Sequence, residues 1–291
     1  MNSFGRLFRV SLFGESHGKC IGVTIDGCPG GVSLSEADFE NDLKRRKSGI
    51  KGTTPRIELD KPNIVSGILN GNTTGAPITI IFENKNIHPK DYDIFKDIPR
   101  PGHADFVAMK KYSGFNDYRG GGHFSGRLTI GIVAAGVLAK KIISPIKISS
   151  TLIEAGGTKN IEMAVEKAIK AGDSIGGIIE CNVKNVPIGL GEPFFDSAES
   201  LISHIVFSIP GIKGIEFGSG FKAAEMKGSN HNDPIINNEG KTSTNNAGGI
   251  NGGITNGNDI IFRVAVKPTP SISLIQHTMN IKTNEMTDLS I

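Results

Sequence analysis

Aromatic residues and cysteine are both scarce in this chain, which has no tryptophan, three tyrosines and three cysteines in 291 residues. With a net charge of only +3, the sequence gives no sign of a basic, base-stacking surface for nucleic acid. Cys20, Cys28 and Cys181 are odd in number and lack CxxC spacing, so they support neither a disulfide framework nor a zinc site. We expect three buried free thiols and no bound metal.

Long hydrophobic runs are also missing. No apolar stretch approaches the roughly 18–20 residues of a membrane span, and the N-terminal sequence MNSFGRLFRVSLFGE lacks the apolar block and the cleavage site of a signal peptide. We therefore expect a cytoplasmic protein without membrane contact. The absence of Walker A, GxGxxG and GxSxG motifs argues against an ordinary nucleotide loop and against a hydrolase nucleophile elbow.

Glycine, by contrast, is abundant, with 38 of 291 residues, against a usual share of about 7%. The glycines cluster in four segments, at residues 14–30, 114–126, 211–220 and 239–257. Such clusters indicate backbone that turns tightly or lies against a ligand.

The hydrophobic pattern mixes strands and helices in both halves, with recurring β-α-β units. It predicts strands at 6–13, 21–26, 63–69, 77–83, 146–157, 175–187, 214–228 and 260–268, and helices at 36–47, 128–144, 160–172 and 197–209. The Gly/Asn-rich residues 228–258 are expected to form a long surface loop. We find no linker and expect one α+β domain over residues 1–291.

Three glycine-rich segments each carry a histidine: His17 in GESHG, His103 in RPGHAD and His123 in GGGHFSGR. These histidines do not have metal-ligand spacing, and an imidazole suits proton transfer near neutral pH. Ser16 and His17 are adjacent, and adjacent residues of an extended chain point to opposite faces, so a Ser–His catalytic pair is not expected.

Arginines accompany the same segments, with Arg100 before His103 and Arg127 after His123, while Arg46 belongs to the basic segment LKRRKSGIK. Their forked donors match phosphate and carboxylate oxygens, so the set is typical of a site for a multiply anionic substrate. For Lys44 and Lys47 the alternative is a solvated helix end that complements the helix dipole, and this alternative is weaker for Arg46.

Five segments together carry a resemblance to a known family. They occur in the order FGRLFRVSLFGESHG, IPRPGHADF, YRGGGHFSGR, STNNAGGINGGITNG and VAVKPTPSI, along essentially the whole chain. Their sequence and order resemble those of chorismate synthases. The resemblance implies a β-α-β sandwich fold and a homotetramer. It also implies anti-1,4-elimination of phosphate from 5-enolpyruvylshikimate 3-phosphate to give chorismate, with reduced FMN as cofactor and no net redox change.

The same resemblance implies roles for particular residues. His17 would lie beside the flavin, His103 would protonate the leaving phosphate, Ser16 would relay protons, and Ser125 would be a further catalytic residue. Substrate would be held by Arg46, Arg100 and Arg127, and NADPH, in bifunctional members, by Arg46 and Lys51. Flavin contacts are implied for His123, Phe124, Ser125, Asn246, Ala247, Gly252, Lys267, Pro268, Thr269, Pro270 and Ser271.

Two departures from the family pattern bear on activity. The residues after the three glycines are HFS, where many members have RSS, a variant that we expect to be tolerated. The family also continues beyond MTDLSI with a segment that carries an aspartate and an arginine, so we expect a C-terminally short chain with impaired activity. The alternatives are a non-catalytic flavin- or phosphate-binding remnant, a structural oligomer subunit and an NADPH:flavin reductase.

Overall fold

The computed structural model describes residues 2–49, 52–53 and 58–291. The chain divides into two compact units, of which unit 1 comprises Met1–Ile142 and Pro270–Ile291, and unit 2 comprises Ile143–Thr269. The chain thus leaves unit 1 once and returns to it, and the single domain expected over residues 1–291 stays a prediction.

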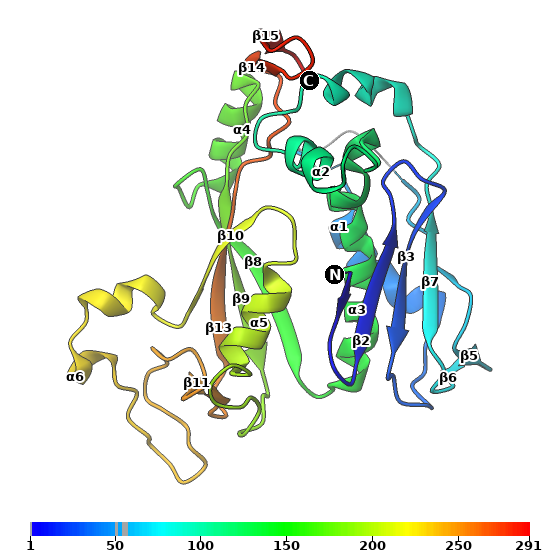
Figure 1. The fold of residues 1–291 in the computed structure, drawn as a ribbon. Coiled ribbons are helices and arrows are strands. Elements are labelled where there is room, and N and C mark those ends of the chain that lie inside the picture. Colours follow the sequence, from blue (N-terminus) through cyan, green and yellow to red (C-terminus); the bar gives the residue numbers. More distant parts are fainter. Residues whose placement is uncertain (1, 50–51, 54–57) are drawn as a thin grey trace. The chain divides into compact units, whose positions relative to one another are not determined.

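Unit 1 contains a five-stranded antiparallel sheet (Figure 1). Ile21, Val23 and Ile25 alternate along the central strand and are fully buried on one face, as a half-buried strand requires. The strand order is β1 (Ser3–Phe4), β2 (Arg9–Gly14), β3 (Cys20–Asp26), β7 (Ile78–Glu83) and β4 (Asn63–Ile64), and β5 (Ile68–Leu69) pairs with β6 (Asn72–Thr73) in a separate ribbon.

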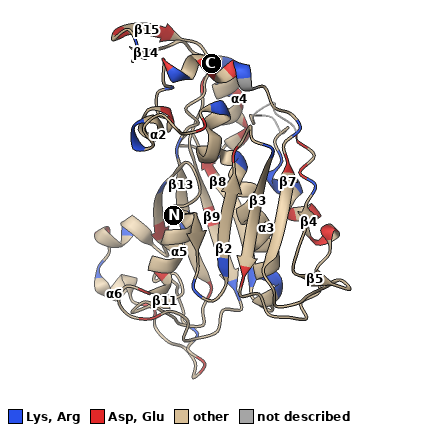
Figure 2. Ribbon diagram, turned by 45° about the vertical axis from the view of Figure 1, so that its right-hand side comes forward, with Lys and Arg blue, Asp and Glu red and all other residues tan. Residues whose placement is uncertain are grey.

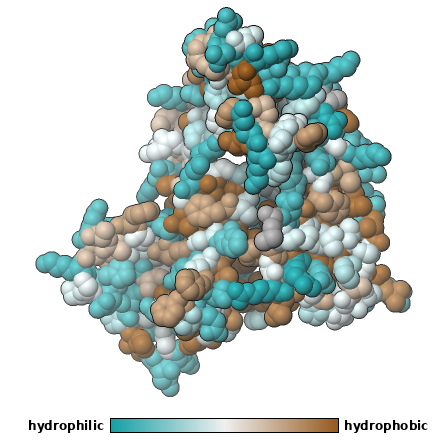
Figure 3. Space-filling model, in the orientation of Figure 1, coloured by the Kyte–Doolittle hydropathy of each residue, from teal (hydrophilic) through white to brown (hydrophobic). Residues whose placement is uncertain are grey.

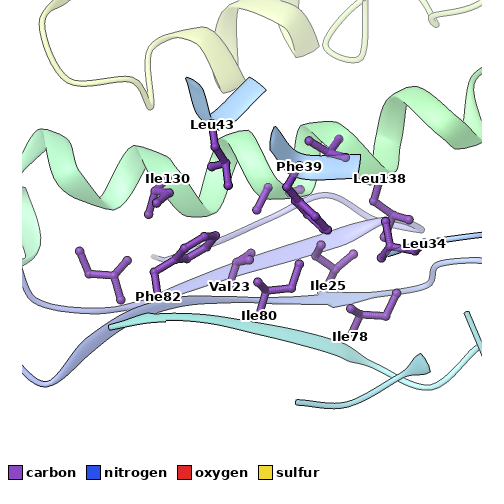
Figure 4. Packing of buried hydrophobic residues seen from close by; sticks show 14 of the residues in the cluster. Val23, Ile25, Leu34, Phe39, Leu43, Ile78, Ile80, Phe82, Ile130 and Leu138 are labelled. Atoms are coloured by element: carbon purple, nitrogen blue, oxygen red, sulfur yellow. The ribbon is translucent and has the colours of Figure 1, made fainter. Parts of the chain in front are cut away.

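Two helical segments cover this buried face. Ser35 begins the first, and its backbone N–H donates to Asp38 Oδ2 at 2.7 Å in a capping box. The segments are η1 (Glu36–Phe39) with α1 (Glu40–Arg46), and α3 (Thr129–Ile142). Figure 4 shows their side chains meeting those of β3 and β7 in one core, which includes Phe39, Leu43, Ile130, Leu138, Val23, Ile25, Ile78, Ile80 and Phe82.

Several short elements complete unit 1, and the hydrophobic pattern did not predict them. The backbone N–H of Ile281 donates to the Asp97 carbonyl at 2.8 Å, which ties the C-terminal hairpin to the segment before α2. The elements are η2 (Pro89–Lys96), α2 (Asp105–Lys111), η3 (Arg119–Phe124), η4 (Gly126–Leu128), β14 (Gln276–Asn280) and β15 (Glu285–Leu289).

Unit 2 contains a four-stranded antiparallel sheet with two longer helices (Figure 1). Asn160 caps α4 by accepting from the Met163 N–H, and Gly172, with φ 66°, ends it. The strand order is β10 (Ile212–Phe217), β13 (Ile260–Val266), β9 (Gly177–Lys184) and β8 (Lys147–Ala155). The other elements are α4 (Ile161–Ala171), α5 (Ala198–Val206), η5 (Gly220–Glu225), α6 (Gly228–His231), β11 (Ile250–Asn251) and β12 (Ile254–Thr255).

The α+β class is confirmed, whereas two predicted strands are partly wrong. The segment expected as one strand at 63–69 contains two short strands, β4 and β5, which belong to different sheets. The strand expected at 214–228 ends at Phe217, because Gly218 turns the chain with φ 55° and the Glu216 carboxylate then accepts the Phe221 N–H at 3.1 Å. The expected loop at 228–258 contains α6 and the β11–β12 hairpin. The neighbouring strands in both large sheets are antiparallel, which the recurring β-α-β pattern had not indicated.

Charge and hydropathy are mixed over the chain. Figure 2 shows acidic and basic residues interspersed along the ribbon, and the face drawn in Figure 3 shows hydrophobic residues scattered among hydrophilic ones. Cys28 is buried as expected, whereas Cys20 and Cys181 are half-buried. Among the described residues, the helices are all too short or too polar to cross a membrane.

Candidate functional site

His17 and Ser16 lie in the turn that connects β2 and β3, and both are buried, with 4% and 1% of their surface exposed. The Ser16 N–H donates to the Gly122 carbonyl at 3.0 Å, so this turn is joined to the glycine run of η3. The ring of Tyr92 stands edge-on to the His17 imidazole with 4.8 Å between the ring centroids. The candidate imidazole therefore occupies a fixed position inside unit 1.

Asn84, directly after β7, holds the turn from the other side. Its Nδ2 donates to the carbonyls of Glu15 and Gly18, both at 2.9 Å, and its Oδ1 accepts from Arg127 Nε at 2.6 Å. One amide thus satisfies two turn carbonyls and orients a buried guanidinium group.

The glycine run of η3 contacts both candidate histidines. Gly120 and Gly121 have φ values of 57° and 76°, which glycine adopts without strain. A Cβ atom added to Gly120 would lie 2.2 Å from His17 Nδ1, and one added to Gly121 would lie 2.9 Å from His103 Cε1. The backbone therefore passes against His17 and His103 at consecutive residues.

His103, which is half-buried, forms a cluster with Asp105 and Arg100, whose side chains are each 6% exposed. His103 Nδ1 lies 2.7 Å from Asp105 Oδ1, and Arg100 donates to the same carboxylate from Nε at 2.8 Å and from Nη2 at 2.9 Å. Burial by itself would raise the pKa of the Asp105 carboxyl, but the hydrogen bonds from Arg100 and His103 outweigh it, and the pKa falls well below its usual range. The ionised carboxylate orients the imidazole and directs Nε2 away from it.

Arg46 and Arg127 meet at a second buried carboxylate, Asp60. Arg127 Nη1 donates to Asp60 Oδ1 at 2.8 Å, and Arg46 Nη1 donates to Asp60 Oδ2 at 3.1 Å. Arg46 Nη2 also donates to the Arg127 carbonyl at 3.3 Å, and its Nε donates to the Thr129 hydroxyl at 3.4 Å. Two positive charges therefore converge on one carboxylate.

The three predicted substrate arginines are thus engaged within the protein. The side chain of Arg46 is 20% exposed, and those of Arg100 and Arg127 are each 6% exposed. These arginines lie in unit 1 together with His17 and His103. Asn84 bonds to Arg127, the glycines of η3 approach both histidines, and the Tyr92 ring lies beside Arg100. Their direct contact with substrate stays a prediction.

His123, Phe124 and Ser125 end the glycine run and begin η4. His123 Nδ1 donates to the Gly14 carbonyl at 3.0 Å, and its Nε2 lies 2.9 Å from Asn2 Oδ1. The Phe124 ring is 38% exposed, and Ser125 Oγ accepts from the backbone N–H two residues ahead at 3.4 Å. Phe124 is therefore the member of this triplet whose side chain offers open apolar surface.

Asn246 and Ala247 lie in unit 2, where Asp233 fixes their backbone. The Asp233 carboxylate accepts from the N–H groups of Asn246 and Ala247, each at 2.8 Å, and from the Thr244 hydroxyl at 2.7 Å. Burial raises the pKa of Asp233, but these hydrogen bonds outweigh it, and the net shift is downward. Gly252, in the β11–β12 turn, is exposed with φ 60°.

The segment from Lys267 to Ser271 follows β13. The Lys267 N–H donates to the Gly211 carbonyl at 2.8 Å, and the Thr269 carbonyl accepts from Ser174 Oγ at 2.7 Å. Pro270 and Ser271 begin the part of the chain that returns to unit 1, and Pro268 is exposed. Lys51 lies outside the described residues.

Sequence reasoning missed the residues that position the site. Asp105 could have been found because it follows His103 by two residues within a quoted motif, and Asn84 because it directly follows a predicted strand. Asp60, Tyr92 and Asp233 carry no such local signal, since their partners are distant in sequence. The missed residues are Asp60, Asn84, Tyr92, Asp105 and Asp233.

Comparison with known proteins gives consistent matches. A family model described as chorismate synthase matches residues 8–291. Proteins named chorismate synthase are 63% identical over 292 residues in Chitinophaga pinensis and 46% identical over 322 residues in Dehalococcoides mccartyi, and each alignment covers 100% of this chain and 88% of the relative. A solved structure titled "Crystal Structure of Chorismate Synthase" matches with a TM-score of 0.74 and 29% identity, over 91% of this chain and 85% of that chain.

Proposed function

The chain belongs to the chorismate synthase family, a family of lyases, and from this premise we propose that it converts 5-enolpyruvylshikimate 3-phosphate to chorismate and phosphate. The observation that carries the proposal is the part-buried cluster of His103, Asp105 and Arg100 beside the glycine run that also contacts His17. An elimination of phosphate needs a proton donor and positive charge at the leaving group, and this cluster contains both.

His103 is the proposed proton donor. Because its Nδ1 is held by Asp105, its Nε2 is the atom that can give a proton to the departing phosphate. The Arg100 Nη2 atom lies 3.2 Å from His103 Nδ1, so a positive charge belongs to the same cluster as the proposed proton donor. Asp105 acts through both residues and is a positioning residue.

Arg46 and Arg127 are proposed to provide charge for the carboxylates or the phosphate of the substrate. Their shared carboxylate, Asp60, keeps both guanidinium groups in one place before substrate arrives. Such preorganisation lowers the cost of orienting the charges during reaction.

Reduced FMN is the proposed cofactor. In unit 1, Phe124 offers an apolar face. In unit 2, the flavin contacts of Asn246, Ala247 and Lys267 stay predictions, because the N–H groups of Asn246 and Ala247 already donate to the Asp233 carboxylate. The buried His17 is proposed to hold a proton beside the cofactor's ring. When bound, reduced FMN would supply transient electron density that assists cleavage of the C–O bond.

Several finer expectations stay predictions. They are the homotetramer, the cytoplasmic location, the binding of NADPH by Arg46 and Lys51, the proton relay by Ser16 and the catalytic role of Ser125. Similarity over the whole of this chain and 88% of each relative named chorismate synthase does not favour the alternative of a non-catalytic remnant.

The test is anaerobic turnover of 5-enolpyruvylshikimate 3-phosphate with chemically reduced FMN, followed by the absorbance of chorismate. We expect activity in the wild type and a loss of roughly 100- to 10,000-fold in His103→Ala. The matched control is His277→Ala, because His277 also pairs with a carboxylate, Asp288 at 2.9 Å, but on the exposed C-terminal hairpin. Wild-type protein that binds FMN but forms no chorismate would contradict the proposal, and equal losses in both variants would contradict the role of His103.

A further inference from the structure

We propose that Gly120 and Gly121 are positioning residues that set the spacing between the imidazoles of His17 and His103. The effect that we predict on turnover rests on the proposed function, whereas the effect on the positions of the imidazoles can be tested without it. It starts from the observation that two consecutive left-handed glycines contact two different histidines, one each.

Gly121 leaves no room for a larger residue because the His103 ring cannot move aside freely. An added Cβ would lie 2.9 Å from His103 Cε1 and 3.3 Å from its Nε2, the atom proposed to donate the proton. The neighbouring ring atom Nδ1 is held by Asp105 at 2.7 Å. A displacement of the ring therefore strains this part-buried, charge-assisted hydrogen bond.

Gly120 leaves even less room beside the His17 ring than Gly121 leaves beside His103. An added Cβ would lie 2.2 Å from His17 Nδ1 and 2.3 Å from its Cε1, both far inside van der Waals contact. The ring is 4% exposed and packs edge-on against Tyr92, so a close-packed environment surrounds it. A methyl group at this position would force the imidazole or the loop to move.

The two contacts are linked because they belong to one short stretch of rigid backbone. Consecutive Cα atoms lie about 3.8 Å apart. The Gly121 N–H donates to the Tyr118 carbonyl at 3.2 Å, and the next glycine, Gly122, passes so close to Asp117 that an added Cβ would lie 2.0 Å from its carbonyl oxygen. The Gly122 carbonyl also accepts from the Ser16 N–H at 3.0 Å, so hydrogen bonds hold the backbone on both sides of the link between Gly121 and Gly122. We infer that this stretch acts as a spacer between the imidazoles.

The chain offers two matched controls on the same segment. Gly114 has φ +81°, and an added Cβ there meets no atom within 4 Å among the described residues, so Gly114→Ala carries the backbone strain without the contact. Gly126 has neither a positive φ nor a described atom within 4 Å of an added Cβ, so Gly126→Ala reports the generic effect of alanine in this region.

The experiment measures ring resonances by NMR on protein with ¹⁵N-labelled histidine, with His17 and His103 assigned from His17→Gln and His103→Gln. We expect Gly120→Ala to shift the resonances of His17 and Gly121→Ala to shift those of His103 and their dependence on pH. Gly114→Ala and Gly126→Ala are expected to leave both unchanged. Should Gly120→Ala not fold, Gly121→Ala decides the test, because its overlap is milder.

Turnover supplies the second measurement. We expect kcat to fall roughly 100-fold in Gly121→Ala while the KM for 5-enolpyruvylshikimate 3-phosphate changes little, because misplacing a catalytic group by about 1 Å costs about that factor. Unchanged imidazole resonances in Gly121→Ala, or equal shifts in Gly114→Ala, would overturn the inference. Shifted resonances in a protein whose wild type forms no chorismate would instead support the spacer and refute the proposed function.

Discussion

Asp105 couples the stability of the fold to pH at the scale of a single residue. Its pKa is lower in the folded protein than in the unfolded chain, so its stabilising contribution is complete above the unfolded pKa of about 4 and is lost as pH falls toward the folded pKa. We expect Asp105→Asn to lower the free energy of unfolding by about 3–5 kcal/mol at pH 7, because Arg100 loses its buried counter-charge.

Urea unfolding between pH 3 and pH 7 measures this effect. The difference between the wild type and Asp105→Asn should shrink as the pH falls below about 4. Asp288→Asn serves as the control, since Asp288 pairs with His277 at an exposed position and should change stability by less than about 1 kcal/mol. A difference for Asp105→Asn that does not depend on pH would show that its charge is not the stabilising feature.

Asn84 stabilises the turn that contains His17. We expect Asn84→Ala to lower the free energy of unfolding by about 1–3 kcal/mol, because the carbonyls of Glu15 and Gly18 and the Nε of Arg127 lose a shared partner. Thermal unfolding measures the loss. In Asn72→Ala, which removes an exposed side chain that donates to the Asn70 carbonyl, the change should stay within about 0.5 kcal/mol. Equal effects in the two variants would contradict this role of Asn84.

The histidines could be predicted from the sequence, whereas most of their partners could not. His17 and His103 stand in short glycine-rich motifs, which mark unusual backbone in any sequence. Asp60 contacts Arg127 across 67 residues of chain, and Tyr92 reaches His17 across a similar separation. Long-range contacts of this kind depend on how the strands and helices pack, and hydrophobic periodicity does not encode them.

At the scale of elements, the segment around Asn246 depends on one carboxylate. Asp233 accepts hydrogen bonds from the backbone of Asn246 and Ala247 and from the Thr244 hydroxyl. We expect Asp233→Ala to weaken binding of reduced FMN by at least about 10-fold, since hydrogen bonds to a charged group are worth about 1.5–3 kcal/mol. Anaerobic flavin titration measures the affinity. In the control Asp173→Ala, which removes an exposed carboxylate of unit 2, affinity should not change.

Unchanged FMN affinity in Asp233→Ala would show that this segment does not contribute to the cofactor site. A second measurement identifies the cause of a loss, because hydrogen exchange at the Asn246 and Ala247 amides should accelerate in the variant if the carboxylate orders the segment.

The elements themselves were predictable where hydrophobic periodicity was strong. The central strand β3 and the long helix α3 have regular apolar patterns, and both formed as expected. The helical segments η2 and η3 were missed, since η2 is rich in charge and η3 consists mostly of glycines with positive φ. The strand predicted at 214–228 was too long because the chain turns at Gly218, whose N–H donates to the carbonyl of the distant Ile261 at 2.9 Å, a contact that follows from tertiary structure.

At the scale of the whole molecule, the chain leaves unit 1 after Ile142 and returns to it at Pro270. The returning segment contributes buried surface, since Leu289 in β15 is 1% exposed. No local pattern in a five-residue strand indicates which distant unit it joins. Unit 1 therefore depends on contacts between parts of the chain that are more than a hundred residues apart. Bringing such distant parts together costs loop-closure entropy.

Leu289→Ala tests this dependence. Removing a fully buried leucine side chain should lower the free energy of unfolding by about 2–5 kcal/mol, and the loss should fall on unit 1 because Leu289 belongs to it. Hydrogen exchange should therefore accelerate at the amides of β3 and β7 and remain unchanged at those of β9 and β13. Leu274→Ala, in the same returning segment but 45% exposed, should have a much smaller effect. Equal acceleration of hydrogen exchange in both sheets would mean that the two units unfold together. The two units would then not differ in their free energy of unfolding.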